Sequence, residues 1–311
     1  MNATIEAMAL RLMSVRGVRA VALGGSRARG THRADSDWDL GVYYRGEPDV
    51  AALAALAAEV TGSPVEVAGP GGWGPWVNGG AWLSVDGVAV DWILRDLDRV
   101  ERVWAECEQG RFEIGTQPGH PLGFWSPAYA GEVALCRVLA DTDGELTALR
   151  AAARSYPEPL RTALAEAVWE ADFSVAAARK AAGPAGNGAG SGGGAGSGGG
   201  AGNGGGPGTG GGPGTGGGPG TGGESGPTGD VLYVSLCLSR AFGILVQALL
   251  AHHRVWCLNE KGALATAAAL PHTPPDFAHR VAAALQGLDA AAVEAAGALV
   301  RDVRAVLDGG A

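Results

Sequence analysis

The sequence predicts an α+β protein, in which a part with both strands and helices is followed by an α-helical bundle. Short runs of β-branched and other apolar residues, such as residues 18–23, lie in the first part and are typical of buried strands. In the second part, apolar residues recur at helical spacing, and a Gly-rich segment at 183–229 interrupts the helices. We therefore expect two domains, at residues 1–125 and 126–311, with 183–229 as a disordered insertion in the second.

The first segment is expected to form an amphipathic helix, because Ile5, Met8 and Leu12 fall on one helical face. Glu6, and the lack of a basic stretch followed by an apolar one, distinguish this segment from a signal peptide. No apolar run in the sequence approaches the length of a membrane span. We therefore expect a cytoplasmic protein without a membrane segment.

The stretch at residues 18–44 carries the most chemical information. Its first strand ends in a Gly-Gly-Ser turn that includes Gly25 and Ser26, and such a turn before a helix leaves backbone N–H groups free to bind phosphate. Asp37 and Asp39 open a second strand and point to the same face, since strand side chains alternate. Two neighbouring carboxylates repel each other unless a cation lies between them, and Mg²⁺ or Mn²⁺ prefers such ligands. The stretch therefore predicts a phosphate site beside a metal site, as phosphoryl or nucleotidyl transfer requires.

Residues 83–97 are expected to form a β-hairpin, because Asp86-Gly87 is favoured in two-residue turns. Asp91 is a single carboxylate among the apolar residues of the second strand. Burying an unpaired carboxylate is unfavourable, so its presence indicates a partner. We expect Asp91 to be a third ligand of the metal.

Residues 18–44 resemble the signature of the DNA polymerase β-like nucleotidyltransferase superfamily, in which Gly-Ser and a spacer precede Asp-x-Asp. Each motif alone is common in turns and strand edges, but their combination with a third carboxylate favours a catalytic member. The resemblance implies a nucleotidyltransferase-type mixed sheet with helices, and a triphosphate bridged by two divalent ions. The implied residues are Asp37, Asp39 and Asp91 for metal and catalysis, and Gly25 and Ser26 for the phosphates.

Helical spacing on both sides of the Gly-rich segment predicts an antiparallel helical hairpin with an enlarged turn. The insertion repeats hexamers from 189 to 224 and is too rich in glycine to offset the entropy of ordering. Its role is left open, either neutral or in binding a partner. The helices expected in this half are 164–178 and 231–249 in the hairpin, 131–140 and 145–155 before it, and one or two Ala-rich helices at 277–307.

The stretch at 235–264 is similar to the C-terminal helical domain of bacterial aminoglycoside nucleotidyltransferases, in which a lysine contacts the nucleotide phosphates. By position Lys261 would take this role, and Arg240 would lie on the adjacent helix. The chain has Glu260 before this lysine, where the family usually shows serine. Two alternatives stay open: a solvated Lys261 at a helix start, and an Arg240 that pairs with a core acid.

Arginines and tryptophans are further candidates in the expected cleft. Arg27 and Arg29 follow the Gly-Gly-Ser turn, where a guanidinium can bind phosphate oxygens through two hydrogen bonds. The resemblance to the superfamily implies that Arg29 reaches the phosphates, and we expect the other arginine to face solvent. A Gly-rich loop before the hairpin contains Trp73, Trp76 and Trp82. These rings either stack on a base or an acceptor ring, or cap the sheet.

Composition limits the partners. A chain of 311 residues with 46% hydrophobic content can hold two modest domains. The net charge of −9 argues against a general nucleic-acid surface, and with it against a template-directed polymerase. The four cysteines are scattered without C-x-x-C spacing and are expected to be free thiols in a reducing cytoplasm. The oligomeric state is not predicted.

These observations predict a metal-dependent transferase that moves a nucleoside monophosphate, AMP from ATP by family habit, to a hydroxyl of a small molecule. An aminoglycoside-like antibiotic, and hence antibiotic resistance, is one candidate. Two alternatives stay open: an antitoxin-type adenylyltransferase that modifies a protein, and a non-catalytic nucleotide-binding regulator. The expected cofactors are Mg²⁺ or Mn²⁺, with ATP as co-substrate and Gly25, Ser26, Arg29 and Lys261 as its binding residues.

Overall fold

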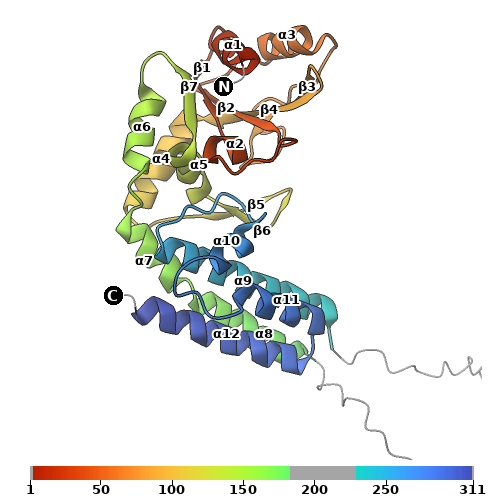
Figure 1. Ribbon diagram of the computed structural model, residues 1–311, viewed down its shortest axis with the longest axis vertical. Coiled ribbons are helices and arrows are strands. Elements are labelled where there is room, and N and C mark those ends of the chain that lie inside the picture. Colours follow the sequence, from red (N-terminus) through yellow and green to blue (C-terminus); the bar gives the residue numbers. More distant parts are fainter. Residues whose placement is uncertain (1–2, 183–228, 310–311) are drawn as a thin grey trace, which may run out of the picture.

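The computed structural model describes residues 3–182 and 229–309. The disordered insertion expected at 183–229 therefore falls, apart from Gly229, outside the described residues. The described part is elongated, with a covered sheet at one end and packed helices at the other (Figure 1). A two-stranded hairpin of β5 (Ile114–Gln117) and β6 (His120–Trp125) lies between them (Figure 1). This arrangement confirms the expected α+β class.

The main sheet is mixed, since β2 and β4 run parallel while the other neighbours are antiparallel. In the expected hairpin, Asp86 and Gly87 have φ values of 52° and 77°, as a two-residue turn of this hand requires. The hairpin prediction is therefore confirmed. In sheet order the strands are β3 (Gly79–Val85), β4 (Val88–Asp96), β2 (Trp38–Tyr44), β1 (Val18–Leu23) and β7 (Arg137–Asp141).

The last strand of this sheet corrects the helix predicted at 131–140. Helix α5 (Pro127–Leu135) ends before Cys136, and β7 then pairs with β1. The apolar spacing continues past Leu135, but β7 hydrogen-bonds the side of β1 that β2 leaves free. Because β7 belongs to the sheet, we propose that the boundary expected at residue 125 lies beyond Asp141.

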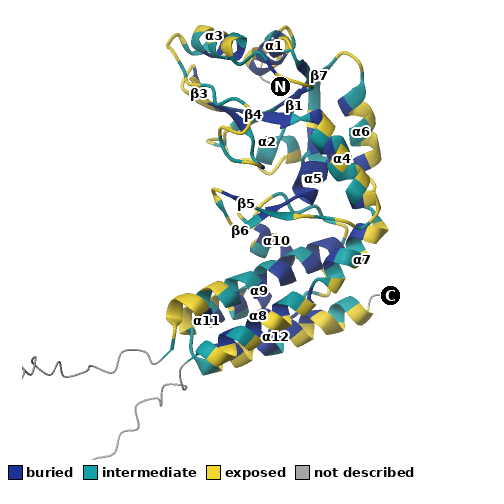
Figure 2. Cartoon of the chain, turned by 180° about the vertical axis from the view of Figure 1, so that it is seen from behind, coloured by how far each residue is buried: buried dark blue, intermediate teal, exposed yellow. Residues whose placement is uncertain are grey.

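Helices cover both faces of the sheet (Figures 1 and 2). Val21 and Trp92 lie on the face that packs against α1 (Ala3–Leu12) and α3 (Val50–Thr61). Ile5, Met8 and Leu12 of α1 are buried there, which confirms the amphipathic helix. The opposite face carries Ala20, Ala22 and Tyr43 and packs against residues of α4 (Leu97–Glu108), α5 and α6 (Glu145–Ala153).

The second half is a helical bundle, as predicted. Its centre is α9, which packs antiparallel to α8 with the Asp230 N–H donating to the Ala181 carbonyl at 3.1 Å. The upstream helix of the expected hairpin is divided at 167–168 into α7 and α8. The bundle helices are α7 (Glu158–Glu166), α8 (Trp169–Ala181), α9 (Val231–His252), α10 (Ala263–Ala268), α11 (Phe277–Gly287) and α12 (Ala290–Gly309).

Helix α9 corrects the expectation that no apolar run approaches the length of a membrane span. Its 22 residues include a window with a mean hydropathy of 1.8, which is enough for a membrane span by length and composition. Neighbouring helices bury 61% of that window (Figure 2). This burial is the pattern of a core helix.

Candidate active site

Two aspartates lie side by side at the end of the sheet. Asp39 on β2 and Asp91 on β4 are in register across parallel strands, so their side chains leave the same face. Asp37 is exposed and lies immediately before β2, so it is not in the strand as expected. The register therefore brings Asp39 and Asp91 together, with Asp37 at the entrance to the strand.

The turn after β1 is built for close approach to Asp39. The Gly24 N–H donates to the Asp39 carbonyl at 2.7 Å, which ties the turn to β2. Gly25 has a φ of 61°, and a Cβ on it would lie 1.7 Å from Asp39 Oδ2. Helix α2 (Gly25–Arg29) starts here, and Gly24 offers its first N–H groups no side-chain cap. Only glycine fits at position 25, because both the backbone angle and the carboxylate exclude a side chain.

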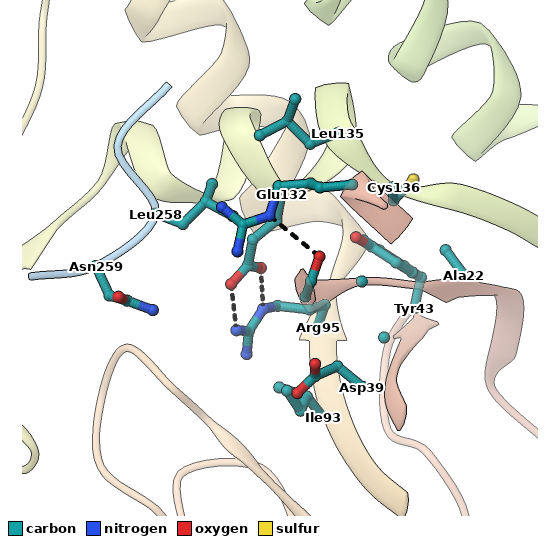
Figure 3. A pocket seen from close by; sticks show the side chains of 14 residues that line it. Ala22, Asp39, Tyr43, Ile93, Arg95, Glu132, Leu135, Cys136, Leu258 and Asn259 are labelled. Atoms are coloured by element: carbon teal, nitrogen blue, oxygen red, sulfur yellow. Dashed lines mark hydrogen bonds and ion pairs between the residues drawn. The ribbon is translucent and has the colours of Figure 1, made fainter. Parts of the chain in front are cut away.

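A cavity of about 150 Å³ opens beside these residues (Figure 3). The sheet face and the α2 turn form one wall, α5 forms another, and Leu258 and Asn259 of the helical half close the third. The Arg29 side chain lines this cavity, and its Nε donates to the Gly25 carbonyl at 3.1 Å. The lining residues are Ala22, Gly24, Gly25, Arg29, Asp39, Gly41, Tyr43, Ile93, Arg95, Glu132, Leu135, Cys136, Leu258 and Asn259.

An ion pair that we did not predict lies in the wall of this cavity. Arg95 Nε and Nη2 contact the two Glu132 carboxylate oxygens at 2.7 and 2.8 Å (Figure 3). The Arg95 side chain is only 5% exposed, and its Nη1 also donates to the Val77 carbonyl at 2.7 Å. An arginine in an otherwise apolar strand was the available signal, by the same reasoning that singled out Asp91.

The carboxylates interact electrostatically. Burial raises the pKa of Asp39 above its usual value, and the charges of Asp37 and Glu132 raise it further, whereas Arg29 and Arg27 lower it. Burial, followed by the charges of Asp39 and Asp37, raises the pKa of Asp91 to about 6. Asp37 is therefore close enough to disfavour the ionised forms of Asp39 and Asp91, and Asp39 is close enough to disfavour that of Asp91.

A divalent cation would relieve this repulsion. Within residues 3–182 and 229–309, no three acidic, histidine or cysteine side chains form a ready-made metal site. The chemistry of the donors still fits Mg²⁺ or Mn²⁺, because carboxylates with raised pKa values are stabilised by a hard cation.

The remaining predicted residues differ in their exposure to solvent and in whether they line a cavity. Lys261 is exposed and lines a second cavity together with Arg29, Leu258 and Asn259, which also border the first. Ser26 is half-buried next to Gly25 and, like Asp37 and Asp91, is not part of either lining.

The two arginines after the turn separate, but Arg27 is half-buried and does not face solvent as expected. Arg27 turns away from the cavity: its Nε donates to the Ser36 carbonyl at 2.9 Å, and its guanidinium lies 4.3 Å from the Trp38 ring centre. Arg29 is the one that lines both cavities. Arg240 pairs with Glu170 at 2.6 Å, which favours its structural interpretation.

The tryptophans serve mainly as packing. Trp76 is buried against Phe124, with ring centres 5.5 Å apart. Trp73 stacks on the exposed Trp82 at 4.3 Å, on the β3 side of the sheet. None of the three lines the cavities beside Asp39, but Trp82 is 69% exposed and lies opposite Asp91 in the β3–β4 register, so stacking on a base or an acceptor ring stays open for it.

A family model agrees with this geometry. Residues 8–68 match the model described as "Nucleotidyltransferase domain". This segment is similar to nucleotidyltransferase domains, and the similarity supports a transferase enzyme. The matched segment includes Gly25, Ser26, Arg29, Asp37 and Asp39, whereas Asp91 and Lys261 lie beyond it.

Comparisons with whole proteins are less informative. No curated protein matches the chain significantly. Among solved structures, a nucleotidyltransferase-like protein from Exiguobacterium sibiricum 255-15 is 11% identical, with 99% of this chain and 74% of that chain covered. The TM-score is 0.36, which is too low to support an argument about fold or function.

Gly25→Ala is expected to lower nucleotide affinity at least about tenfold, because the new Cβ would push the Asp39 carboxylate out of place. Gly30→Ala is the matched control: Gly30 has a similar φ of 72°, but no atom of the described residues lies within 4 Å of the place its Cβ would take. Both variants carry the same backbone strain, so only Gly25→Ala should weaken binding in a titration with a non-hydrolysable ATP analogue. Equal losses in the two variants would contradict the steric explanation.

Asp91→Asn is expected to stabilise the metal-free protein in a pH-dependent way. A carboxyl whose pKa is higher in the folded than in the unfolded protein costs stability once pH rises between these values and ionises it. For Asp91 this window runs from about 4 to about 6. The Tm advantage of Asp91→Asn in a chelator-containing buffer should therefore be small at pH 4.5 and larger at pH 7. A difference that does not change with pH would contradict the raised pKa.

Proposed function

We propose that the protein transfers a nucleoside monophosphate from ATP to a hydroxyl group of a small molecule, with Mg²⁺ or Mn²⁺ as the cofactor. The observation that carries this proposal is the register of Asp39 and Asp91 beside the Gly25 turn. A cavity at this place is lined by Arg29 on one side and by the helical half on the other, so a nucleotide and an acceptor have separate walls.

Asp37, Asp39 and Asp91 would hold the metal ions, which when bound neutralise the triphosphate and make the acceptor hydroxyl more acidic. The Gly25 and Ser26 N–H groups and the Arg29 guanidinium bind the β- and γ-phosphates, and Lys261 adds a second cation from the helical half. The Asp91 carboxylate takes the proton of the attacking hydroxyl. The acceptor oxygen then bonds to the α-phosphorus, while the bond to the bridging oxygen breaks and pyrophosphate leaves.

Transfer of label from two forms of ATP tests the reaction. With a small-molecule acceptor, label at the α-phosphate is expected in the product, and label at the γ-phosphate is expected only in pyrophosphate. Transfer of the γ-label to the acceptor would instead identify a kinase and overturn the proposal. Comparing the transfer rates from ATP, GTP, CTP and UTP tests whether ATP is the preferred donor. Adding a chelator tests whether transfer requires a divalent metal ion.

The choice of acceptors separates the remaining possibilities. A panel of hydroxylated small molecules, with aminoglycosides among them, is compared with a cell lysate. Label on a protein band alone would favour the antitoxin-type alternative, and tight ATP binding without any transfer would favour a regulator. Growth of cells that express the protein, with and without the antibiotics of the panel, tests resistance. A cytoplasmic location is part of the proposal and is checked by fractionating the same cells.

A further inference from the structure

A third cavity, which is apolar and about 200 Å³ in volume, lies in the helical half, where β6 meets α9, α10 and α11. Trp125, Phe242 and Val281 are among its walls and are themselves buried in the bundle core. Figure 1 shows the β5–β6 hairpin between the sheet and these helices. The cavity is lined by Leu122, Trp125, Ser239, Phe242, Gly243, Val246, Gln247, Cys257, Glu260, Ala263, Leu264, Val281 and Leu285.

Glu260 is the one charged side chain among these described lining residues. Its Oε2 lies 3.1 Å from His120 Nδ1, and its Oε1 lies 3.4 Å from the Leu122 backbone N. These contacts come from one side, that of β6, and hold the carboxylate at the edge of an otherwise apolar space. Arg240 is paired with Glu170, and the contact of Glu260 with His120 is an ion pair only when the imidazole is protonated.

A small pocket of about 10 Å³ borders both this cavity and the candidate active site. It shares Trp125, Gln247 and Glu260 with the apolar cavity, and Leu258 and Asn259 with the cavity beside Asp39. The short segment 258–260 therefore contacts both spaces.

We propose that this cavity binds the acceptor, and that the acceptor is an amphipathic amine with an apolar body and a single ammonium group that pairs with Glu260. The inference rests on the function proposed above. An apolar body gains free energy by leaving water for these walls, and an ammonium gains a charge-assisted hydrogen bond. A polycationic sugar would have to bury several charges and hydroxyls against walls that offer them few partners, which is unfavourable.

Three probes with the same apolar body test the binding chemistry: 4-phenylbutylamine, 4-phenylbutan-1-ol and 4-phenylbutanoate. Their affinities for the full-length protein are measured by ligand-observed NMR without nucleotide or metal. We expect the amine to bind at least about tenfold more tightly than the alcohol, and the alcohol more tightly than the carboxylate. Glu260→Gln should remove the advantage of the amine and leave the affinity of the alcohol within about twofold.

Two variants fill the cavity. Leu264→Trp adds volume from α10, and Ser239→Phe adds it from α9, and both should weaken all three probes at least about tenfold. Ala265→Trp is the matched control, because Ala265 is exposed on the same helix as Leu264 and does not line the cavity. Thermal unfolding of each variant confirms that it is folded, and at least one filled variant must retain the wild-type affinity for an ATP analogue.

The acceptor role is tested with phenylalaninol, an apolar amino alcohol, against kanamycin. Transfer of α-label to phenylalaninol should exceed transfer to kanamycin, and Leu264→Trp should raise the KM for phenylalaninol with an unchanged KM for ATP. Equal affinities for the amine and the carboxylate would overturn this inference, and so would unchanged probe binding in both filled variants. In either case, transfer of α-label to other acceptors would still support the proposed function. Failure of all transfer would overturn the proposed function and the acceptor role, and the Glu260-dependent preference for amines would then identify a separate ligand site.

Discussion

Asp39→Asn is expected to lower kcat for nucleotidyl transfer by about 1,000-fold or more without unfolding the protein. Asp39 lies in register with Asp91 and lines the cavity beside Gly25, so its loss removes a charge from the place where metal and triphosphate are proposed to meet. Stabilisation by a metal site is worth several kcal/mol, and each 1.4 kcal/mol corresponds to about tenfold in rate. The measurement is the rate of label transfer at saturating ATP and Mg²⁺.

The stability of the same variant separates a lost function from a lost fold. Because burial and the charge of Asp37 raise the pKa of Asp39, the neutral asparagine should keep or raise the Tm of the metal-free protein. Asp35→Asn is the control, since Asp35 is an exposed carboxylate in the preceding loop that pairs with Arg33. Its activity should stay within about twofold of wild type. Near-wild-type transfer by Asp39→Asn would rule out the proposed role of this carboxylate.

Local patterns in the sequence were sufficient for the elements near Asp39. Alternation along 88–94 and the Asp86-Gly87 turn predict the hairpin that carries Asp91, and the structure has that hairpin. The Gly-Gly-Ser turn predicts a helix start, and α2 begins at Gly25. These features depend on residues close together in the chain, so periodicity and turn chemistry describe them well.

Features that depend on distant partners could not be predicted in this way. The stretch after Leu135 is compatible with a helix, and becomes β7 because β1 has a free edge more than a hundred residues earlier in the chain. Glu132 gains its place in the cavity wall only through Arg95, on a strand that precedes it by 37 residues. Neither pairing leaves a mark in local spacing.

Breaking this buried ion pair is expected to be the most destabilising single change near the cavity. Glu132→Gln removes the carboxylate that contacts two nitrogens of Arg95, whose side chain is only 5% exposed. The guanidinium cannot lose its proton and would remain buried without a counter-charge. We expect a loss of about 3 kcal/mol in the free energy of unfolding, measured by urea denaturation.

A double variant separates two causes of this destabilisation: loss of the attraction between Arg95 and Glu132, and burial of the Arg95 charge without a partner. Arg95→Met with Glu132→Leu removes both charges and takes the Arg95 donor from the Val77 and Leu94 carbonyls, so it should cost less than Glu132→Gln alone. Glu106→Gln serves as the exposed control: its pair with Arg111 is in solvent, and its loss should leave the urea midpoint unchanged. If the double variant were the less stable of the two, the pair itself would stabilise the wall beside Asp39. The Arg95–Glu132 ion pair would then contribute to the stability of the fold as well as to the electrostatics of the cavity.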